Sequence, residues 1–160
     1  MHPFWNFLKI LKKILLTLLG LFIIAQFFGP EKNDGDIATI ETFMNETKPP
    51  ENVKVVLKEA CIDCHSDHTR YPWYNNITPV NYWLADHVKH GKGHFNVSEW
   101  AEYSVKKKDH KLDELIEMVE RKDMPLPSYT WTHSEAKLTD AQIKELLEWA
   151  QSVRDSYNLD

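Results

Sequence analysis

The feature that most constrains this chain is a five-residue run, Cys61-Ile62-Asp63-Cys64-His65, which contains both cysteines of the 160-residue sequence. Two thiols three positions apart on one turn can each reach one vinyl group of a porphyrin and form a thioether. The following imidazole then points at the iron from the same side. This C-x-x-C-H spacing is the attachment motif of c-type haem. The sequence therefore predicts one covalent haem c, held by Cys61 and Cys64, with His65 as an axial ligand.

Three other interpretations of the paired cysteines are open. A thioredoxin-like redox pair would need a βαβ context, which the sequence does not show. A zinc site would need further ligands, and a structural disulfide would join the two thiols directly. We favour haem over all three. The histidines that could complete a zinc site are His68, His87, His90 and His94.

The sixth position of the iron needs a second ligand, and Met124 is the preferred residue. It lies 59 residues after His65, where a predicted helix ends, and the prolines at 125 and 127 stiffen the loop. Thioether sulfur favours ferrous iron, so a His/Met pair raises the reduction potential. One of His87, His90 and His94 could instead complete bis-histidine ligation, with a lower potential, or the sixth position could stay open.

Aromatic residues are dense between the two ligand motifs, and Tyr71, Trp73 and Tyr74 are predicted to bind the haem. Rings cover a large flat apolar disc with few residues, and their polar groups can hydrogen-bond the propionates. Arg70 is a further candidate partner for a propionate. The carbonyl of Pro79 is a candidate acceptor for the Nδ1 hydrogen of His65, which would fix the tautomer of the imidazole.

The amino-terminal segment combines basic and apolar residues. Lys9, Lys12 and Lys13 precede an apolar run over residues 14–28, which as a helix would be roughly 22 Å long, against a bilayer core of about 30 Å. Residues 4–8 extend the apolar stretch. We expect residues 1–30 to be a signal or anchor that contacts the membrane through residues 4–28. A single uncleaved anchor would hold the following domain in the periplasm, at a bacterial inner membrane. A cleaved signal peptide is the alternative.

The rest of the chain favours helices. Apolar residues recur at helical spacing over residues 53–60, 112–119 and 143–153, and a shorter helix is expected over 82–90. Thr139 and Gln142 form a predicted capping box, and Ser98 is a candidate cap for a short helix. No segment alternates with a period of two for long. The predicted fold class is all-α, with residues 31–48 as a tether and residues 49–160 as the haem domain.

Residues 61–66, 71–74, 77–80, 98–100 and 124–129 together resemble the bacterial haem-binding domain family, whose members are small, single-haem, cytochrome c-like proteins of the cell envelope. Residues 138–149 are similar to the final helix of class I cytochromes c. The resemblance covers about residues 50–155. It implies thioethers at Cys61 and Cys64, a proximal His65 and a distal Met124. The long aromatic insert after His65 departs from a minimal cytochrome c, and the resemblance implies no physiological role.

These features predict a membrane-tethered monohaem c-type cytochrome that carries one electron at a time between redox partner proteins of the envelope. Such a protein is an electron carrier rather than an enzyme. The alternative is a haem-based sensor or a peroxidase-like enzyme with an open or labile sixth ligand. Nucleic acid is excluded as the main partner because the net charge is -5, and residues 31–160 hold 16 basic against 24 acidic groups.

Overall fold

The computed structural model describes residues 3–157, and within that range the regular secondary structure is helical apart from one isolated antiparallel bridge between Asp34 and His68. The predicted all-α class is confirmed. The α-helices are α1 (Pro3–Ala25), α2 (Glu41–Thr47), α3 (Glu51–Ala60), α4 (Ile62–His65), α5 (Val80–His94), α6 (Val105–Glu120), α7 (Pro127–Thr130) and α8 (Asp140–Asp155). Short 3₁₀ helices are η1 (Ile37–Ile40), η2 (Trp73–Asn76), η3 (Val97–Glu102) and η4 (Ser134–Ala136).

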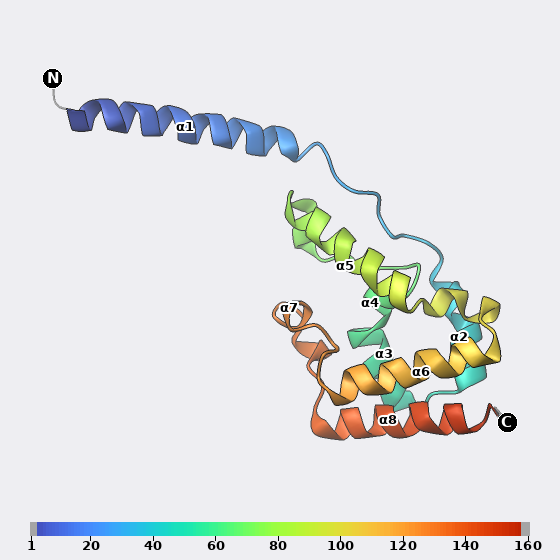
Figure 1. Ribbon diagram of the computed structural model, residues 1–160. Helices are drawn as coiled ribbons and strands as arrows, with labels where there is room; N and C mark the ends of the chain where they lie inside the picture. Colours follow the sequence, from blue (N-terminus) through green and yellow to red (C-terminus); the bar gives the residue numbers. More distant parts are fainter. Residues whose placement is uncertain (1–2, 158–160) are drawn as a thin grey trace. The chain divides into compact units, whose positions relative to one another are not determined.

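The chain forms two compact units. The first contains the residues up to Lys32 together with Tyr71–His87, and the second contains Asn33–Arg70 together with the residues from Val88 onward. Helix α5 begins in the first unit and ends in the second. Both units can be followed by colour in Figure 1.

In the first unit, side-chain hydrogen bonds join the residues after α1 to the start of α5. The amide of Gln26 accepts from the backbone N–H of Thr78 at 2.9 Å and donates to its carbonyl at 3.1 Å. The Thr78 hydroxyl donates to the carbonyl of Phe28 at 3.0 Å and accepts from the Asn81 amide at 3.0 Å. Thr78 is buried, so these bonds satisfy polar groups that water does not reach.

Helix α1 corrects the expectation of a membrane anchor. Among the described residues, no helix is long and apolar enough to cross a membrane. The physical reason is that α1 contains Lys9, Lys12 and Lys13, so its longest uncharged part is residues 14–25. That part is roughly 18 Å long, well short of the bilayer core of about 30 Å. The predicted inner-membrane location through a single amino-terminal anchor is therefore wrong.

The core of the second unit is built around aromatic rings. Phe43, which lies in the segment expected to be a tether, is fully buried. Its ring meets the edges of Phe95, Trp100 and Trp149, with centroids 6.2, 4.9 and 6.1 Å away. Such edge-to-face pairs add about 0.5–1.5 kcal/mol each beyond the burial of apolar area. Within residues 3–157, the Nε1–H of Trp100 is buried without a hydrogen-bond partner.

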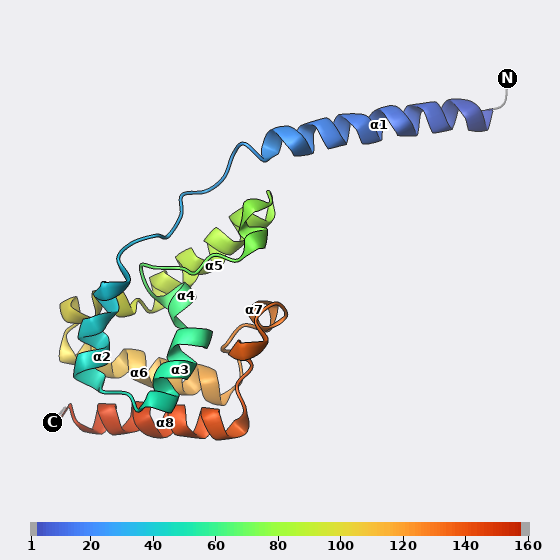
Figure 2. The ribbon, with the colours of Figure 1, turned by 180° about the vertical axis from the view of Figure 1, so that it is seen from behind.

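Helices α6 and α8 pack side by side in opposite directions and close one side of this core (Figures 1 and 2). Leu112 on α6 and Leu146 on α8 are fully buried. Helix α6 begins at Ser104, whose hydroxyl accepts from the N–H of Lys107. Helix α8 begins with the predicted capping box, because Thr139 and Gln142 each accept a hydrogen bond from the other's backbone N–H. The sequence signal for this helix start is confirmed.

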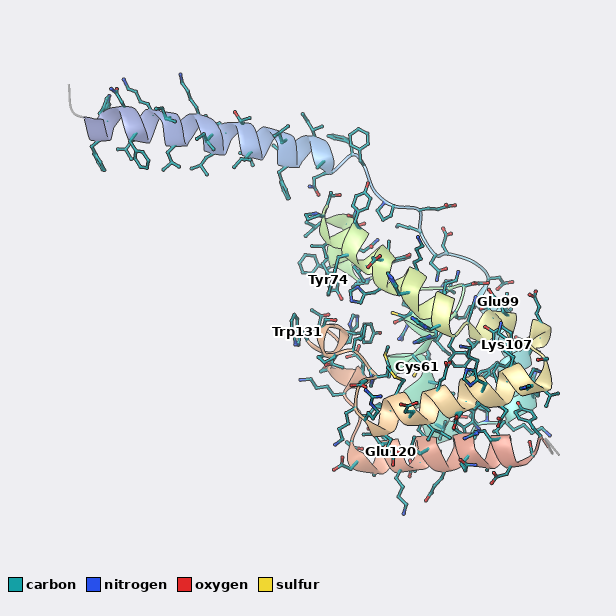
Figure 3. The ribbon with its side chains drawn as sticks, viewed as in Figure 1. Cys61, Tyr74, Glu99, Lys107, Glu120 and Trp131 are labelled. Carbon is teal, nitrogen blue, oxygen red and sulfur yellow. The ribbon has the colours of Figure 1, made fainter. Side chains whose placement is uncertain are left out.

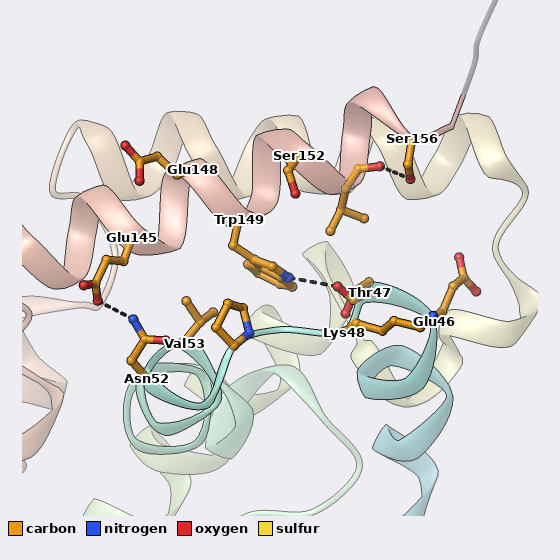
Figure 4. Close-up of a pocket in the computed structure, with 12 residues that line it drawn as sticks. Glu46, Thr47, Lys48, Asn52, Val53, Glu145, Glu148, Trp149, Ser152 and Ser156 are labelled. Carbon is orange, nitrogen blue, oxygen red and sulfur yellow. Dashed lines mark hydrogen bonds between the residues drawn. The ribbon is translucent and has the colours of Figure 1, made fainter.

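A surface hollow of about 480 Å³ lies between α8 and the chain from Glu46 to Val53. Figure 4 shows the N–H of Trp149 donating to the carbonyl of Thr47, at 3.0 Å, and the amide of Asn52 donating to Glu145. No residue predicted for the haem site lines this hollow. Its contacts join α8 to the turn between α2 and α3.

Candidate functional site

The two cysteines and His65 lie on one tight turn in the second unit. Helix α3 ends at Ala60, and Figure 3 shows Cys61 where α3 gives way to α4. The backbone N–H groups of Cys64 and His65 both donate to the carbonyl of Cys61, at 3.1 and 3.0 Å. Both thiols are free and half-buried. The turn thus brings together two unbonded sulfur atoms and one imidazole.

The surroundings of the thiols disfavour the redox interpretation. Burial raises the pKa of Cys61 to about 12, and burial together with the charge of Asp63 raises the pKa of Cys64 to about 11. Reactive redox cysteines have lowered pKa values, because the thiolate is the nucleophile. The part of the chain that the structure describes also contains no group of three His, Cys, Asp or Glu side chains arranged to hold a metal ion.

The imidazole of His65 is held in one tautomer by the backbone. Its Nδ1 lies 2.9 Å from the carbonyl of Phe95. A carbonyl only accepts, so Nδ1 carries the proton and the lone pair remains on Nε2. Burial lowers the pKa of His65, against the opposing effect of hydrogen bonds to the Phe95 and Gly91 carbonyls. A neutral imidazole with a fixed Nδ1–H is the form that binds iron through Nε2.

The carbonyl that holds His65 is not the one suggested by the sequence. Pro79 accepts instead from the N–H groups of Tyr82 and Trp83, in the first turn of α5. Its carbonyl belongs to the hydrogen bonding of that helix. Phe95, which follows the last residue of α5, supplies the acceptor for His65.

Gly91 allows α5 to approach the cysteine turn closely. A Cβ atom built on Gly91 would lie 2.5 Å from the carbonyl oxygen of Cys64 and 3.1 Å from its Cβ. Contacts below 3.0 Å to backbone atoms require the backbone to move. The N–H of Phe95 donates to the carbonyl of Gly91 at 2.9 Å. Gly91 therefore helps to set the position of the carbonyl that holds His65.

Asp63, inside the motif, is a buried carboxylate with several donors. Its side chain is 7% exposed. It accepts hydrogen bonds from Nε and from one terminal nitrogen of Arg70, each at 3.0 Å. The Arg70 backbone N–H also donates to it, at 3.1 Å, and the Tyr129 hydroxyl donates at 2.8 Å. Arg70 also donates to Glu59 and to the carbonyl of Lys58. The guanidinium suggested for a propionate is thus bound to the motif itself.

Met124 lies in the same unit as the cysteine turn. Helix α6 ends in a Schellman turn, with Lys122 at φ 59° and the N–H of Asp123 donating to the carbonyl of Met118 at 2.9 Å. The N–H of Met124 donates to the same carbonyl at 3.1 Å. The Met124 side chain is half-buried and packs against the core cluster that Cys61 and Phe95 also contact.

The three predicted aromatic residues belong to the first unit, whereas the cysteines, His65 and Met124 belong to the second. Trp73 is 76% exposed, and its ring meets that of Tyr74 edge-on at 5.8 Å. The ammonium of Lys32 lies 5.6 Å above the ring of Tyr71. The structure therefore brings the two cysteines and His65 together on one turn and places Met124 in the same unit, whereas the three aromatic residues belong to the other unit.

Three residues that support the site were missed by the sequence argument: Phe95, Gly91 and Tyr129. The phenylalanine acts through a backbone carbonyl, which has no side-chain signal. Gly91 directly follows the helix expected over 82–90, and a glycine at such a position is a visible signal of close backbone approach. Tyr129 follows the Met-Pro-Leu-Pro run, and nothing in the sequence connects it to Asp63.

Comparisons with known proteins identify the family. The model of the haem-binding domain matches residues 20–152, most of the chain. Searches of curated proteins and of solved structures found no match to this chain. The matched range contains the cysteine turn, the Phe95 carbonyl and Met124. The chain belongs to the haem-binding domain family.

Proposed function

We propose that this haem protein is a monohaem c-type cytochrome that carries single electrons. In this proposal the haem is attached through Cys61 and Cys64, with His65 and Met124 as axial ligands. The observation that carries it is the hydrogen bond from His65 Nδ1 to the Phe95 carbonyl, on the same turn as two free thiols. That bond leaves Nε2 as the metal-binding atom, beside two sulfurs at the spacing that c-type attachment requires.

The attachment chemistry suits protonated thiols. Cys61 and Cys64 would each hold the haem by adding an S–H bond across one vinyl C=C bond, which would form one C–S and one C–H bond and consume no oxidant. Burial raises the pKa of both cysteines, which favours the protonated thiol over the thiolate. The two cysteines lie three residues apart on one turn, where the N–H of Cys64 donates to the carbonyl of Cys61. This arrangement favours two thioethers on one porphyrin.

The ligand set determines which reaction the protein performs. Bound haem supplies an iron that alternates between the ferric and ferrous states. His65 donates through Nε2, and the Phe95 carbonyl strengthens that donor by accepting the Nδ1 hydrogen. Met124 contributes soft thioether sulfur, which favours the ferrous state and raises the reduction potential. With both axial positions filled by the chain, electron transfer needs neither a substrate pocket nor an acid–base pair.

Two measurements test this proposal. A pyridine haemochrome spectrum of the full-length protein, made with c-type maturation machinery, should report one haem bound through two thioethers. In Met124→Ala the sulfur–iron charge-transfer band should vanish, and the potential should fall by on the order of 0.1 V. Met118→Ala is the matched control, because Met118 is also a half-buried methionine and lies six residues earlier. This substitution should leave the charge-transfer band and the potential unchanged.

Three results would contradict the proposal. Haem that extracts into acidified organic solvent would show that no thioether forms. A Met124→Ala variant with the parent's band and potential would show that the sixth ligand is another group, such as a histidine. Rapid carbon monoxide binding by the unaltered ferrous protein would also count against a carrier with two permanent ligands.

A further inference from the structure

We propose that Tyr129 is a positioning residue, which holds the Met124 segment against the cysteine turn through its hydrogen bond to Asp63. This inference rests on the proposed function, because it assigns a role in keeping Met124 on the iron. Tyr129 is not itself proposed as a ligand of the metal. It acts through Asp63, which lies within the attachment motif, and through the segment 124–129, which joins Tyr129 to Met124.

Asp63 is a fixed point for such a contact. It is 5% exposed, and two parallel N–H groups of Arg70 hold its two oxygens at 3.0 Å each. The Thr69 hydroxyl donates to the Asp63 carbonyl at 2.6 Å. Bidentate guanidinium–carboxylate pairs fix direction as well as distance. The carboxylate therefore cannot follow a moving partner without breaking these bonds.

Tyr129 makes the connection with its hydroxyl. The O–H donates to Oδ2 of Asp63 at 2.8 Å, and the carbonyl of Glu59 lies 3.3 Å away. Burial and the charge of Asp63 raise the pKa of Tyr129, so the phenol remains a donor. On its other side the ring stacks on His133, with centroids 4.1 Å apart and planes 12° from parallel. The ring is held by both its face and its hydroxyl.

The segment between Met124 and Tyr129 is held at its two ends. At the first end, the Met124 N–H donates to the Met118 carbonyl at 3.1 Å, where α6 terminates. At the other end, Tyr129 lies in α7, and its N–H donates to the Leu126 carbonyl at 3.0 Å. Without the phenol hydroxyl, α7 loses its hydrogen bond to the cysteine turn, and one restraint on the segment after Met124 is removed. The Met124 sulfur should then exchange more readily.

Tyr129→Phe tests this inference in the full-length haem-loaded protein. The readout is the affinity of ferric protein for imidazole, which must displace Met124 to bind. We expect that affinity to rise roughly 10-fold or more, as expected for loss of a hydrogen bond to a charged group. The covalent haem content should stay at one per chain. Tyr157→Phe is the matched control, because it removes a similar tyrosine–carboxylate bond, to Glu46 at 3.2 Å, and should leave imidazole affinity unchanged.

A second variant separates positioning from general loosening. Asp63→Asn removes the charge that accepts from Tyr129, and the double variant Tyr129→Phe/Asp63→Asn should bind imidazole no more tightly than Asp63→Asn alone. Independent, additive effects would overturn the inference. Tyr129→Phe with an imidazole affinity within about twofold of the parent would also overturn it.

The two proposals fail in different ways. If Met124→Ala abolishes the sulfur–iron band but Tyr129→Phe leaves imidazole affinity unchanged, the proposed ligation stands and the role of Tyr129 is refuted. If Met124→Ala leaves the band intact, both are refuted, because there is then no sulfur ligand to hold.

Discussion

Substituting alanine for Gly91 should lower the free energy of unfolding, although alanine has a higher helix propensity than glycine. In an ordinary helix position the exchange stabilises by about 1 kcal/mol. At Gly91 the added methyl would lie 2.5 Å from the Cys64 carbonyl, which is backbone and cannot rotate away. Overpacking of this kind costs about 1–3 kcal/mol. The net effect at Gly91 should therefore be a loss of up to about 2 kcal/mol.

Gly93, two residues later in the same helix, provides the control. A Cβ built there meets no atom within 4 Å, so Gly93→Ala should keep the full helical gain of about 1 kcal/mol. Because both exchanges share the propensity change, their difference measures the contact with Cys64, about 1–3 kcal/mol. For a chain of this size that is roughly 3 °C in melting temperature per kcal/mol.

The assay is chemical denaturation of the haem-loaded variants, followed by far-ultraviolet circular dichroism and tryptophan fluorescence. Coincident transitions by the two probes establish that one free energy of unfolding describes each variant. We also expect Gly91→Ala to shift the reduction potential, because the Phe95 carbonyl that holds His65 follows Gly91. Equal unfolding free energies for Gly91→Ala and Gly93→Ala would refute the argument from close approach.

Three further changes should alter the free energy of unfolding, each measurable from its denaturation midpoint. Thr139→Ala should lower it by about 1 kcal/mol, because the capping box of α8 is lost; an unchanged midpoint would contradict this. Lys108→Met should also lower it by about 1 kcal/mol, because the ammonium bonds Glu46 at 2.6 Å, and since Lys108 is buried the loss should not shrink to zero at high salt. Trp149→Phe should cost about 1–3 kcal/mol by leaving the buried Thr47 carbonyl unpaired, and a smaller cost would show that another donor replaces the indole.

The helices that the sequence predicts best are those with local signals. The apolar stripe over residues 53–60 lies within α3, and the Thr139 box starts α8 where expected. Helix α5 is longer than the predicted 82–90, because its glycines lower local helix propensity and close packing on Cys64 compensates. Asn96 rather than Ser98 caps η3, since its side chain accepts from the Ser98 N–H. Both differences arise from tertiary contacts or from competition between adjacent caps.

The candidate site divides in the same way. The thiol and imidazole spacing is a local property, and the sequence therefore predicts that these three groups meet on one turn. The acceptor for His65 comes from Phe95, 30 residues away, through a backbone atom that every residue possesses. Sequence patterns carry no signal for such a contact. At the amino terminus, the apolar composition predicts a membrane anchor. The structure differs because the three lysines lie inside the helix and shorten its uncharged part.

The position between the two cysteines that Asp63 occupies is commonly regarded as free to vary. In this chain it holds a carboxylate that accepts hydrogen bonds from Arg70, 7 positions further along the chain, and from Tyr129, 66 positions further along. Relatives that keep an acid there should also keep a guanidinium and a phenol at the two corresponding places, and relatives that lose one should tend to lose all three. A family alignment would thus display the triad as a co-inherited unit, separate from the cysteines and histidine.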